Sequence, residues 1–225
     1  MFKKALIASA MLVSIIGANA AETATFGVTG GSMPSSCSVA LGNGGSYDFG
    51  TLTYPQLQAL GAYTGNLGSF YHFGVKINSI SVTCGAATSV KLSFTDNKLG
   101  KATVVGDPSD EKRFGLVDGA GTTSIGSVDI SLFDILVDGA APTGLLHAVN
   151  GTTAWSAVNG PWGNHYVTPG HTTGFIKTAA ETVPSSFKTF TANMHTSLFA
   201  KKSYMDSAIN AVVFNSSGVI TLTYL

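Results

Sequence analysis

The stretch that decides the fold lies between residues 75 and 95. Residues 75–84 read VKINSISVTC and residues 89–95 read SVKLSFT, so apolar and polar side chains alternate in both segments. Side chains on a β-strand point to opposite faces in turn, and this alternation is therefore typical of half-buried strands. We predict two strands here, the first of which ends at Cys84 and the second before Asp96.

Segments of the same kind continue to the end of the chain. Helix signals are few: residues 54–60 and 178–183 have the pattern of single helical turns, and residues 139–170 read as long loops with short strands. The 27 glycines are spread out, as expected where many turns need positive φ. The sequence predicts an all-β protein, for which a single β-sandwich is the simplest architecture. Further strands are predicted at residues 113–117, 125–137, 173–178, 187–200, 209–214 and 219–225.

The first twenty residues have the organisation of a secretory signal. Lys3 and Lys4 give a positive start, residues 5–17 are apolar, and residues 18–20 (ANA) form a small-x-small cleavage site. The apolar run is shorter than the roughly 20 residues that cross a bilayer. We predict cleavage and a mature, exported chain that begins near Ala21, with a retained membrane anchor as the alternative.

The charge balance argues against two classes of partner. The chain has 12 basic and 12 acidic residues, and Lys3 and Lys4 are lost with the signal, which leaves a formal charge of −2. This balance gives no electrostatic reason to expect nucleic acid or an anionic membrane as a partner. Charged residues make up only 11% of the chain, so uncharged polar residues and glycine must form most of the surface.

Cysteine and histidine usage favours a disulfide over a metal site. Cys37 and Cys84 form an even pair, which in an oxidising compartment predicts a disulfide; two free buried thiols are the alternative. The histidines do not have the spacing of a zinc motif, no Gly-x-Ser-x-Gly element is present, and no acid/base pair stands out. We predict no metal, no cofactor and no catalytic residue. The five histidines are His72, His147, His165, His171 and His195.

The two ends of the mature chain carry matching strand patterns. One face of the N-terminal segment presents Ala24, Phe26, Val28 and Gly30. One face of the final segment presents Ile220, Leu222 and Tyr224, and the chain stops at Leu225. A final strand with no strand after it exposes unpaired backbone groups unless another chain pairs with it.

This order of elements resembles that of subunits of chaperone–usher fimbriae. The shared features are a signal, an alternating N-terminal segment, a cysteine after residues 34–36 (PSS), a second cysteine at a strand end, and a penultimate tyrosine. The chain also resembles an uncharacterised bacterial family often encoded beside fimbrial chaperones and ushers. That likeness lies in NGG at 43–45, DFG at 48–50, RFGL at 113–116 and TLTYL at 221–225. The chain is longer than a typical shaft pilin.

The resemblance implies a domain organisation and a fold. Residues 36–225 would form an immunoglobulin-like sandwich that lacks its last strand, and residues 21–35 would be an N-terminal extension. In such families a periplasmic chaperone fills the groove first, and the donor strand of the next subunit replaces it at an outer-membrane usher; this is a form of β-augmentation. The implied function is that of a structural pilus subunit at the cell surface, with neither catalysis nor cofactor.

Particular residues would carry these roles. The donor strand would be Ala24, Phe26, Val28 and Gly30; its alternative is a first strand of the protein's own sheet. The strand that meets the chaperone would present Ile220, Leu222 and Tyr224 to the groove, with the Leu225 carboxylate against basic chaperone groups. Its alternative is an ordinary edge strand of a complete sandwich.

Two other functions stay open at this point. A tip adhesin or carbohydrate-binding module would use the loops around Trp155, Trp162, His165 and Tyr166 to contact a host glycan or protein. Two-domain adhesins, however, generally carry a lectin domain where this chain carries its donor-like segment. An exported enzyme is the third possibility.

Overall fold

The computed structural model describes residues 36–65, 68–103, 113–158, 165–208 and 211–225. These residues belong to one compact unit, Pro34–Leu225. The predicted signal and the candidate donor residues Ala24 to Gly30 lie outside the described residues. Within the described ranges, no helix has the length and hydropathy needed to cross a membrane.

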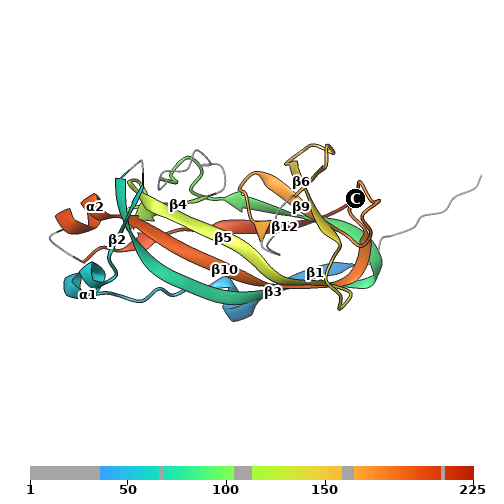
Figure 1. Ribbon diagram of the computed structural model, residues 1–225, viewed down its shortest axis with the longest axis horizontal. Coiled ribbons are helices and arrows are strands. Elements are labelled where there is room, and N and C mark those ends of the chain that lie inside the picture. Colours follow the sequence, from blue (N-terminus) through green and yellow to red (C-terminus); the bar gives the residue numbers. More distant parts are fainter. Residues whose placement is uncertain (1–35, 66–67, 104–112, 159–164, 209–210) are drawn as a thin grey trace, which may run out of the picture. The chain divides into compact units, whose positions relative to one another are not determined.

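The described part of the chain is built almost wholly from strands, which confirms the prediction of an all-β protein (Figure 1). In chain order the elements are β1 (Cys37–Leu41), a 3-10 turn (Gly42–Gly45), α1 (Tyr54–Ala59), β2 (Ala62–Gly65), β3 (Gly68–Asp96), β4 (Phe114–Asp118), β5 (Ser124–Val137), β6 (Gly144–Val149), β7 (Ser156–Ala157), β8 (His165–Tyr166), β9 (His171–Ile176), β10 (Ser186–Lys201), α2 (Lys202–Ser207), β11 (Phe214–Asn215) and β12 (Gly218–Tyr224).

The strands form two sheets that share β3. In the first sheet, the N-terminal part of β3 pairs with β10, and the order continues through β5 and β4 to β11. β1 and β2 pair with the other edge of β3, and β8 pairs with β5. In the second sheet, the C-terminal part of β3 lies between β12 and β9, and β9 leads to β6 and β7.

β3 runs without a break through both segments that were predicted as separate strands. Residues 85–88, expected to interrupt it, stay extended. Gly85, Ala86 and Ala87 have little or no side chain, so the strand can bend there from one sheet to the other without a clash. Opposite this stretch, the register of β10 shifts between Phe187 and Thr189. Strand bends of this kind commonly accompany such irregularities.

Aromatic side chains from both sheets meet in the core. Phe190 on β10 stacks on Phe175 of β9 with ring centroids 4.5 Å apart. Phe187 lies edge-on to Phe175 at 6.3 Å. All three are buried, so this cluster holds the first sheet against the second.

Three sequence-based predictions need correction. Residues 178–183 form turns rather than a helix, because the Glu181 carboxylate accepts the backbone N–H groups of Lys177 and Thr178 and the Ser185 hydroxyl. The helix α2 follows directly after β10 and was not predicted. Of the strand expected at 209–214, the described residues contain only β11, two residues long.

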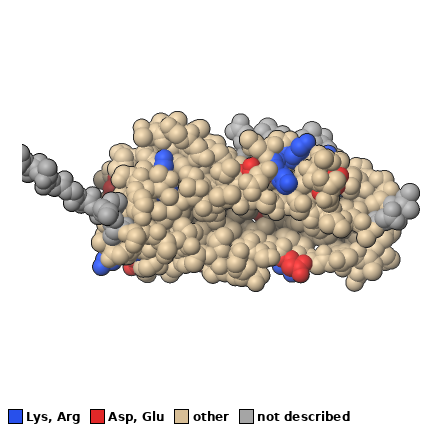
Figure 2. Space-filling model, turned by 180° about the vertical axis from the view of Figure 1, so that it is seen from behind, with Lys and Arg blue, Asp and Glu red and all other residues tan. Residues whose placement is uncertain are grey.

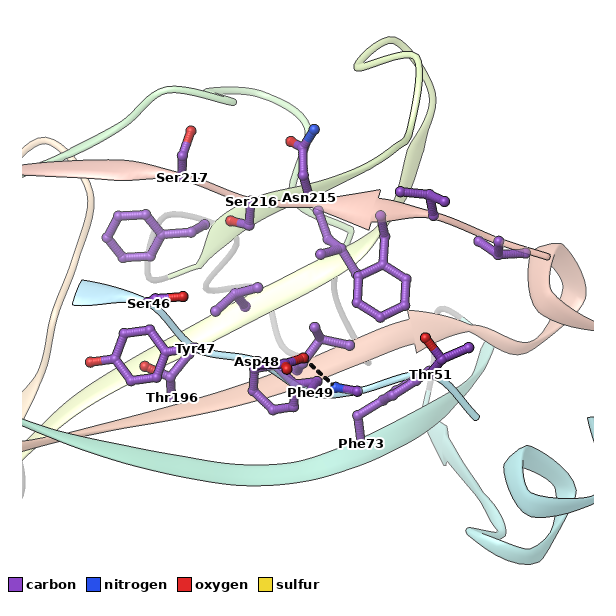
Figure 3. A pocket seen from close by; sticks show the side chains of 18 of the residues that line it. Ser46, Tyr47, Asp48, Phe49, Thr51, Phe73, Thr196, Asn215, Ser216 and Ser217 are labelled. Atoms are coloured by element: carbon purple, nitrogen blue, oxygen red, sulfur yellow. Dashed lines mark hydrogen bonds between the residues drawn. The ribbon is translucent and has the colours of Figure 1, made fainter. Parts of the chain in front are cut away.

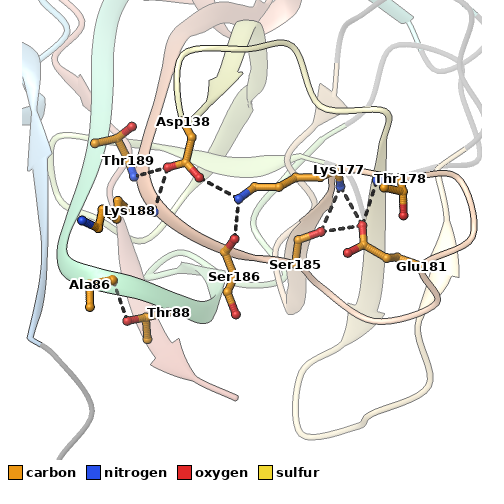
Figure 4. A network of polar contacts seen from close by, with 10 residues as sticks. All are labelled: Ala86, Thr88, Asp138, Lys177, Thr178, Glu181, Ser185, Ser186, Lys188 and Thr189. Carbon is orange, nitrogen blue, oxygen red and sulfur yellow. Dashed lines mark hydrogen bonds and ion pairs between the residues drawn. The ribbon is translucent and has the colours of Figure 1, made fainter.

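A polar network fixes the ends of three strands (Figure 4). Asp138 follows β5 in a left-handed conformation (φ 51°), which Asp tolerates in tight turns. Its carboxylate accepts the backbone N–H groups of Lys188 and Thr189 on β10, at 2.8 and 2.9 Å. The ammonium of Lys177, just after β9, lies 2.6 Å from the same carboxylate. The hydrogen bond from Lys177, followed by that from Thr189, lowers the pKa of Asp138 from 3.8 to about 2.

An Asp138→Asn variant should therefore melt at a lower temperature than the wild type near neutral pH, and this difference should shrink in acid. Because the folded-state pKa is depressed, the charged carboxylate stabilises the fold above its unfolded pKa, and this contribution is lost as the pH falls from about 4 towards 2. Melting temperatures of both proteins between pH 7 and 2 measure the effect, and Lys177→Gln should show the same pH dependence. A difference that stays constant over this range would contradict the assignment.

Candidate functional site

A groove of about 820 Å³ lies between two segments from opposite ends of the domain (Figure 3). One wall is residues 45–54, which run from the end of the 3-10 turn after β1 to the first residue of α1. The other wall is residues 211–220, which include β11 and lead into β12. The groove therefore forms only when the beginning and the end of the domain come together.

The floor of the groove is the hydrophobic core itself. It is formed by apolar side chains of β3, β4, β5 and β10, namely Phe94, Phe114, Leu116, Val128, Ile130, Met194 and Leu198. Most of these belong to the single buried cluster that fills the sandwich. Among the described residues that line the groove, Asp48 alone carries a formal charge. The groove thus suits an apolar, uncharged occupant.

The walls keep apolar side chains partly exposed. Tyr47, Phe49 and Leu52 on one wall, and Phe214 and Ile220 on the other, pack against the core without being fully buried. Tyr47 and Phe49 alternate with exposed residues, as on a strand, although no partner strand lies beside them in the described residues. Filling the groove would remove this apolar surface from water and would stabilise the fold.

The strand edges that flank the groove are not paired with each other. β1 and β12 each pair with β3, and no ladder joins them within the described residues. Each therefore has one edge along which no other strand of the described residues lies. An additional strand laid in the groove could hydrogen-bond to either edge while its side chains enter the core.

The side chain of Tyr47 reaches from the wall to the floor, where its hydroxyl is a polar group. Its hydroxyl donates to the backbone carbonyl of Met194 at 3.5 Å, next to Thr196 (Figure 3). Burial raises the pKa of Tyr47 above 10.0, so the hydroxyl stays protonated at neutral pH. Next along the same wall, the Asp48 carboxylate accepts the Gly50 N–H at 2.7 Å (Figure 3).

The predicted disulfide is confirmed and lies where β1 and β12 converge. Cys37 and Cys84 are opposite each other in the β1–β3 ladder, with sulfurs 2.06 Å apart. The Cys37 N–H donates to the Tyr224 hydroxyl at 2.8 Å. The Leu225 N–H donates to the Ser89 carbonyl at 3.0 Å. The penultimate tyrosine thus ties the end of β12 to the start of β1.

The residues predicted for chaperone contact lie on or beside this site. Ile220 lines the groove, and Leu222, opposite Leu92 in the ladder, is partly buried against the core. Tyr224 and Leu225 are exposed, at 39% and 54%. The candidate donor residues cannot be placed, since they precede the described part of the chain.

Sequence reasoning missed the wall at residues 45–54. The stretches NGG and DFG had served only as points of resemblance, yet the structure places Gly45 and Asp48–Gly50 along the groove. The available signal was the alternation of Tyr47 and Phe49 directly after a predicted disulfide cysteine. This segment was not identified because its pattern is short and is broken by Gly50.

Of the aromatic residues that suggested sugar binding, Trp155 and His165 lie against neighbouring residues of β9. Trp155 packs beside Gly174, where an added Cβ would also meet Pro184 at 2.3 Å. His165 points inward, is 4% exposed, and lies 2.8 Å from the Thr173 hydroxyl. Burial, and to a lesser extent His147, lowers the pKa of His165 to about 4, so the ring is neutral at pH 7.

Two further observations concern the same loops and the histidines. Tyr166 is 55% exposed, and Trp162 lies outside the described residues. In the parts of the chain that the structure describes, no three His, Cys, Asp or Glu side chains gather as a metal site. Charged side chains are also sparse on the face shown in Figure 2.

Comparison with known proteins finds one family. The family described as "Protein of unknown function (DUF1120)" matches residues 26–131, from the candidate donor segment into β5. The chain is therefore similar over that stretch to a family whose function is unknown, as the resemblance to an uncharacterised family led us to expect. No match is found among curated proteins or solved structures.

Proposed function

We propose that the protein is a structural subunit of a fimbria whose sandwich is completed by a β-strand from another chain. The observation that supports this most is the groove, which opens onto the core and is lined in part by Leu41 of β1 and Gly218–Ile220 of β12, two strands that no ladder joins in the described residues. An immunoglobulin-like sandwich without its last strand would leave such a gap. In the family that the sequence resembles, the gap is where subunits join by β-augmentation.

The N-terminal segment has the composition that the groove requires. Residues 24–30 are uncharged and present Phe26 and Val28 between the small residues Ala24 and Gly30. Burying Phe26 and Val28 would contribute roughly 1.5–3 kcal/mol each. Each backbone hydrogen bond to an edge would add about 1 kcal/mol, less the cost of ordering the segment. The donor segment and β12 are both seven residues long.

Export and assembly would follow the order implied by the resemblance. After removal of residues 1–20, a periplasmic chaperone would supply a strand along β12 and keep Ile220 and Leu222 from water. The exposed Leu225 would lie against basic chaperone groups, as the resemblance implies. At the outer-membrane usher, the donor strand of the next subunit would take the place of the chaperone, so the role involves no catalysis and no cofactor.

Two double variants test the donor strand. Phe26→Asp with Val28→Asp should abolish polymerisation while the complex with the chaperone still forms, because charges cannot enter the apolar groove. The matched control, Thr25→Asp with Thr29→Asp, places the same charges on the opposite face and should still polymerise. Polymers are measured by electron microscopy and the chaperone complex by co-purification.

The alternative role of the segment gives a different result. If Phe26→Asp with Val28→Asp fails to fold even with its chaperone, residues 24–30 belong to the subunit's own core and the donor role is wrong. A peptide copying residues 22–31 should also raise the melting temperature of a chain that lacks them. At a concentration 100 times its Kd, the peptide should raise the free energy of unfolding of that chain by about 2.7 kcal/mol.

A further inference from the structure

Two short helices form one end of the groove. α1 contributes Tyr54 and Leu57 to the lining, and α2 contributes Met205, with Ala208 directly after it. Figure 1 shows both helices at the same end of the domain, away from β1. The groove is therefore bounded along its sides by residues 45–54 and 211–220 and at this end by the two helices.

Neither helix is stable by itself. Each is six residues long, and isolated helices of that length do not form in water. Each has a single buried side chain, Leu57 at 4% and Met205 at 8% exposure. The position of this end wall therefore depends on contacts between the helices and the sheet.

One carboxylate makes those contacts. Asp206 of α2 accepts the hydroxyl of Tyr71 from β3 at 2.8 Å and that of Tyr54 from α1 at 3.4 Å, both at Oδ1. Its Oδ2 pairs with the Lys202 ammonium one turn earlier on α2. Tyr71 is only 1% exposed, so its hydroxyl is a fixed anchor in the first sheet.

The surroundings of Asp206 favour the ionised form of its carboxylate. The hydrogen bond from Lys202, followed by that from Tyr71, holds the pKa of Asp206 below 3.8. The Lys202 ammonium lies 5.4 Å from the centre of the Tyr71 ring, a distance at which a cation–π contact is favourable. Hydrogen bonds to an ionised carboxylate are stronger than those between neutral groups.

We propose that Asp206 is a latch that holds α1 and α2 together as the end wall of the groove and so limits how far a partner strand can extend along it. Loss of the carboxylate would free Tyr54 and Tyr71 and let the two helices separate. The claim about strand length rests on the proposed function, whereas the claim about the closed end does not.

Hydrogen exchange of the whole mature chain tests the latch itself. Asp206→Ala should speed amide exchange in residues 54–59 and 202–207 about tenfold or more, with little change in β5 and β10, because only the local opening becomes easier. Asp134→Asn is the control, since Asp134 also accepts a side-chain hydrogen bond, from Asn193, but lies on β5, and Asn tolerates its positive φ of 51°. If Asp206→Ala does not fold, Tyr54→Phe should still speed exchange in residues 54–59.

Two peptides test the limit on strand length. One copies residues 22–31, and the other adds Val-Thr-Val at each end. We expect the wild type to bind both with similar affinity, and Asp206→Ala to bind the longer peptide about tenfold more tightly than the shorter one. Exchange that is unchanged in Asp206→Ala overturns the latch, and equal affinities in that variant overturn the length limit. If neither peptide binds the wild type, the proposed function is contradicted, while hydrogen exchange still decides the latch.

Discussion

Replacing Cys84 with Ser is expected to lower the free energy of unfolding by about 2–5 kcal/mol. The disulfide to Cys37 spans 47 positions of the chain, and closing a loop of that size restricts the unfolded ensemble by roughly 4 kcal/mol in the entropy model. β1, which carries Cys37, has five residues and pairs with β3 alone in the described structure. Without the bond, the start of the domain would detach easily and take one wall of the groove with it.

Equilibrium unfolding in urea measures this loss. Reducing the wild-type protein with dithiothreitol should lower its stability by a similar amount, and so should the double variant Cys37→Ser with Cys84→Ser, which leaves no free thiol. If all three proteins stay within about 1 kcal/mol of the oxidised wild type, the disulfide does not hold β1 in place.

Replacing Phe190 with Ala is expected to cost about 3–5 kcal/mol of stability, the range for aromatic side chains removed from a core. Phe190 is fully buried and stacks on Phe175 from the opposite sheet at 4.5 Å. Because it joins the two sheets, the cavity left behind would weaken the packing of β10 against β9. The peptide that fills the groove should bind more weakly to this variant, since its floor depends on the same packing.

Phe133 provides the matched control. It lies on β5, next to β10, but is only partly buried and stacks on His195 with ring centroids 4.0 Å apart. Phe133→Ala removes the same atoms from a face that water reaches. Urea unfolding should therefore show a loss in the free energy of unfolding that is at least about 1 kcal/mol smaller than that of Phe190→Ala. Equal losses for the two variants would show that the Phe175–Phe190 contact does not hold the sheets together.

Local pattern was sufficient to predict most strands and the disulfide. Alternation located β4, β5, β9, β10 and β12 to within a few residues, because one face of each meets the core. The pairing of Cys37 and Cys84 followed from their number and from the predicted signal alone. Alternation depends only on residues that are close in the sequence, which is why it predicts individual strands.

What the sequence could not show depends on partners distant in the chain. The unbroken course of β3 is set by β10 on one side and by β1 and β12 on the other, not by residues 85–88 themselves. The helix α2 contains Lys202 and Asp206, whose roles appear only beside Tyr71. The groove likewise requires residues 45–54 to lie opposite residues 211–220.

The long shared strand also bears on the order in which the protein can fold. β3 ends at Asp96, but its main partners begin only at Ser186 and Gly218. As the chain is synthesised, β1 and β2 precede β3, but the residues of β3 appear long before those of β10 and β12. Folding dominated by such distant pairings is slow, and unpaired strands with apolar faces tend to aggregate meanwhile. Until β10 is made, the longest ladder of this central strand cannot form.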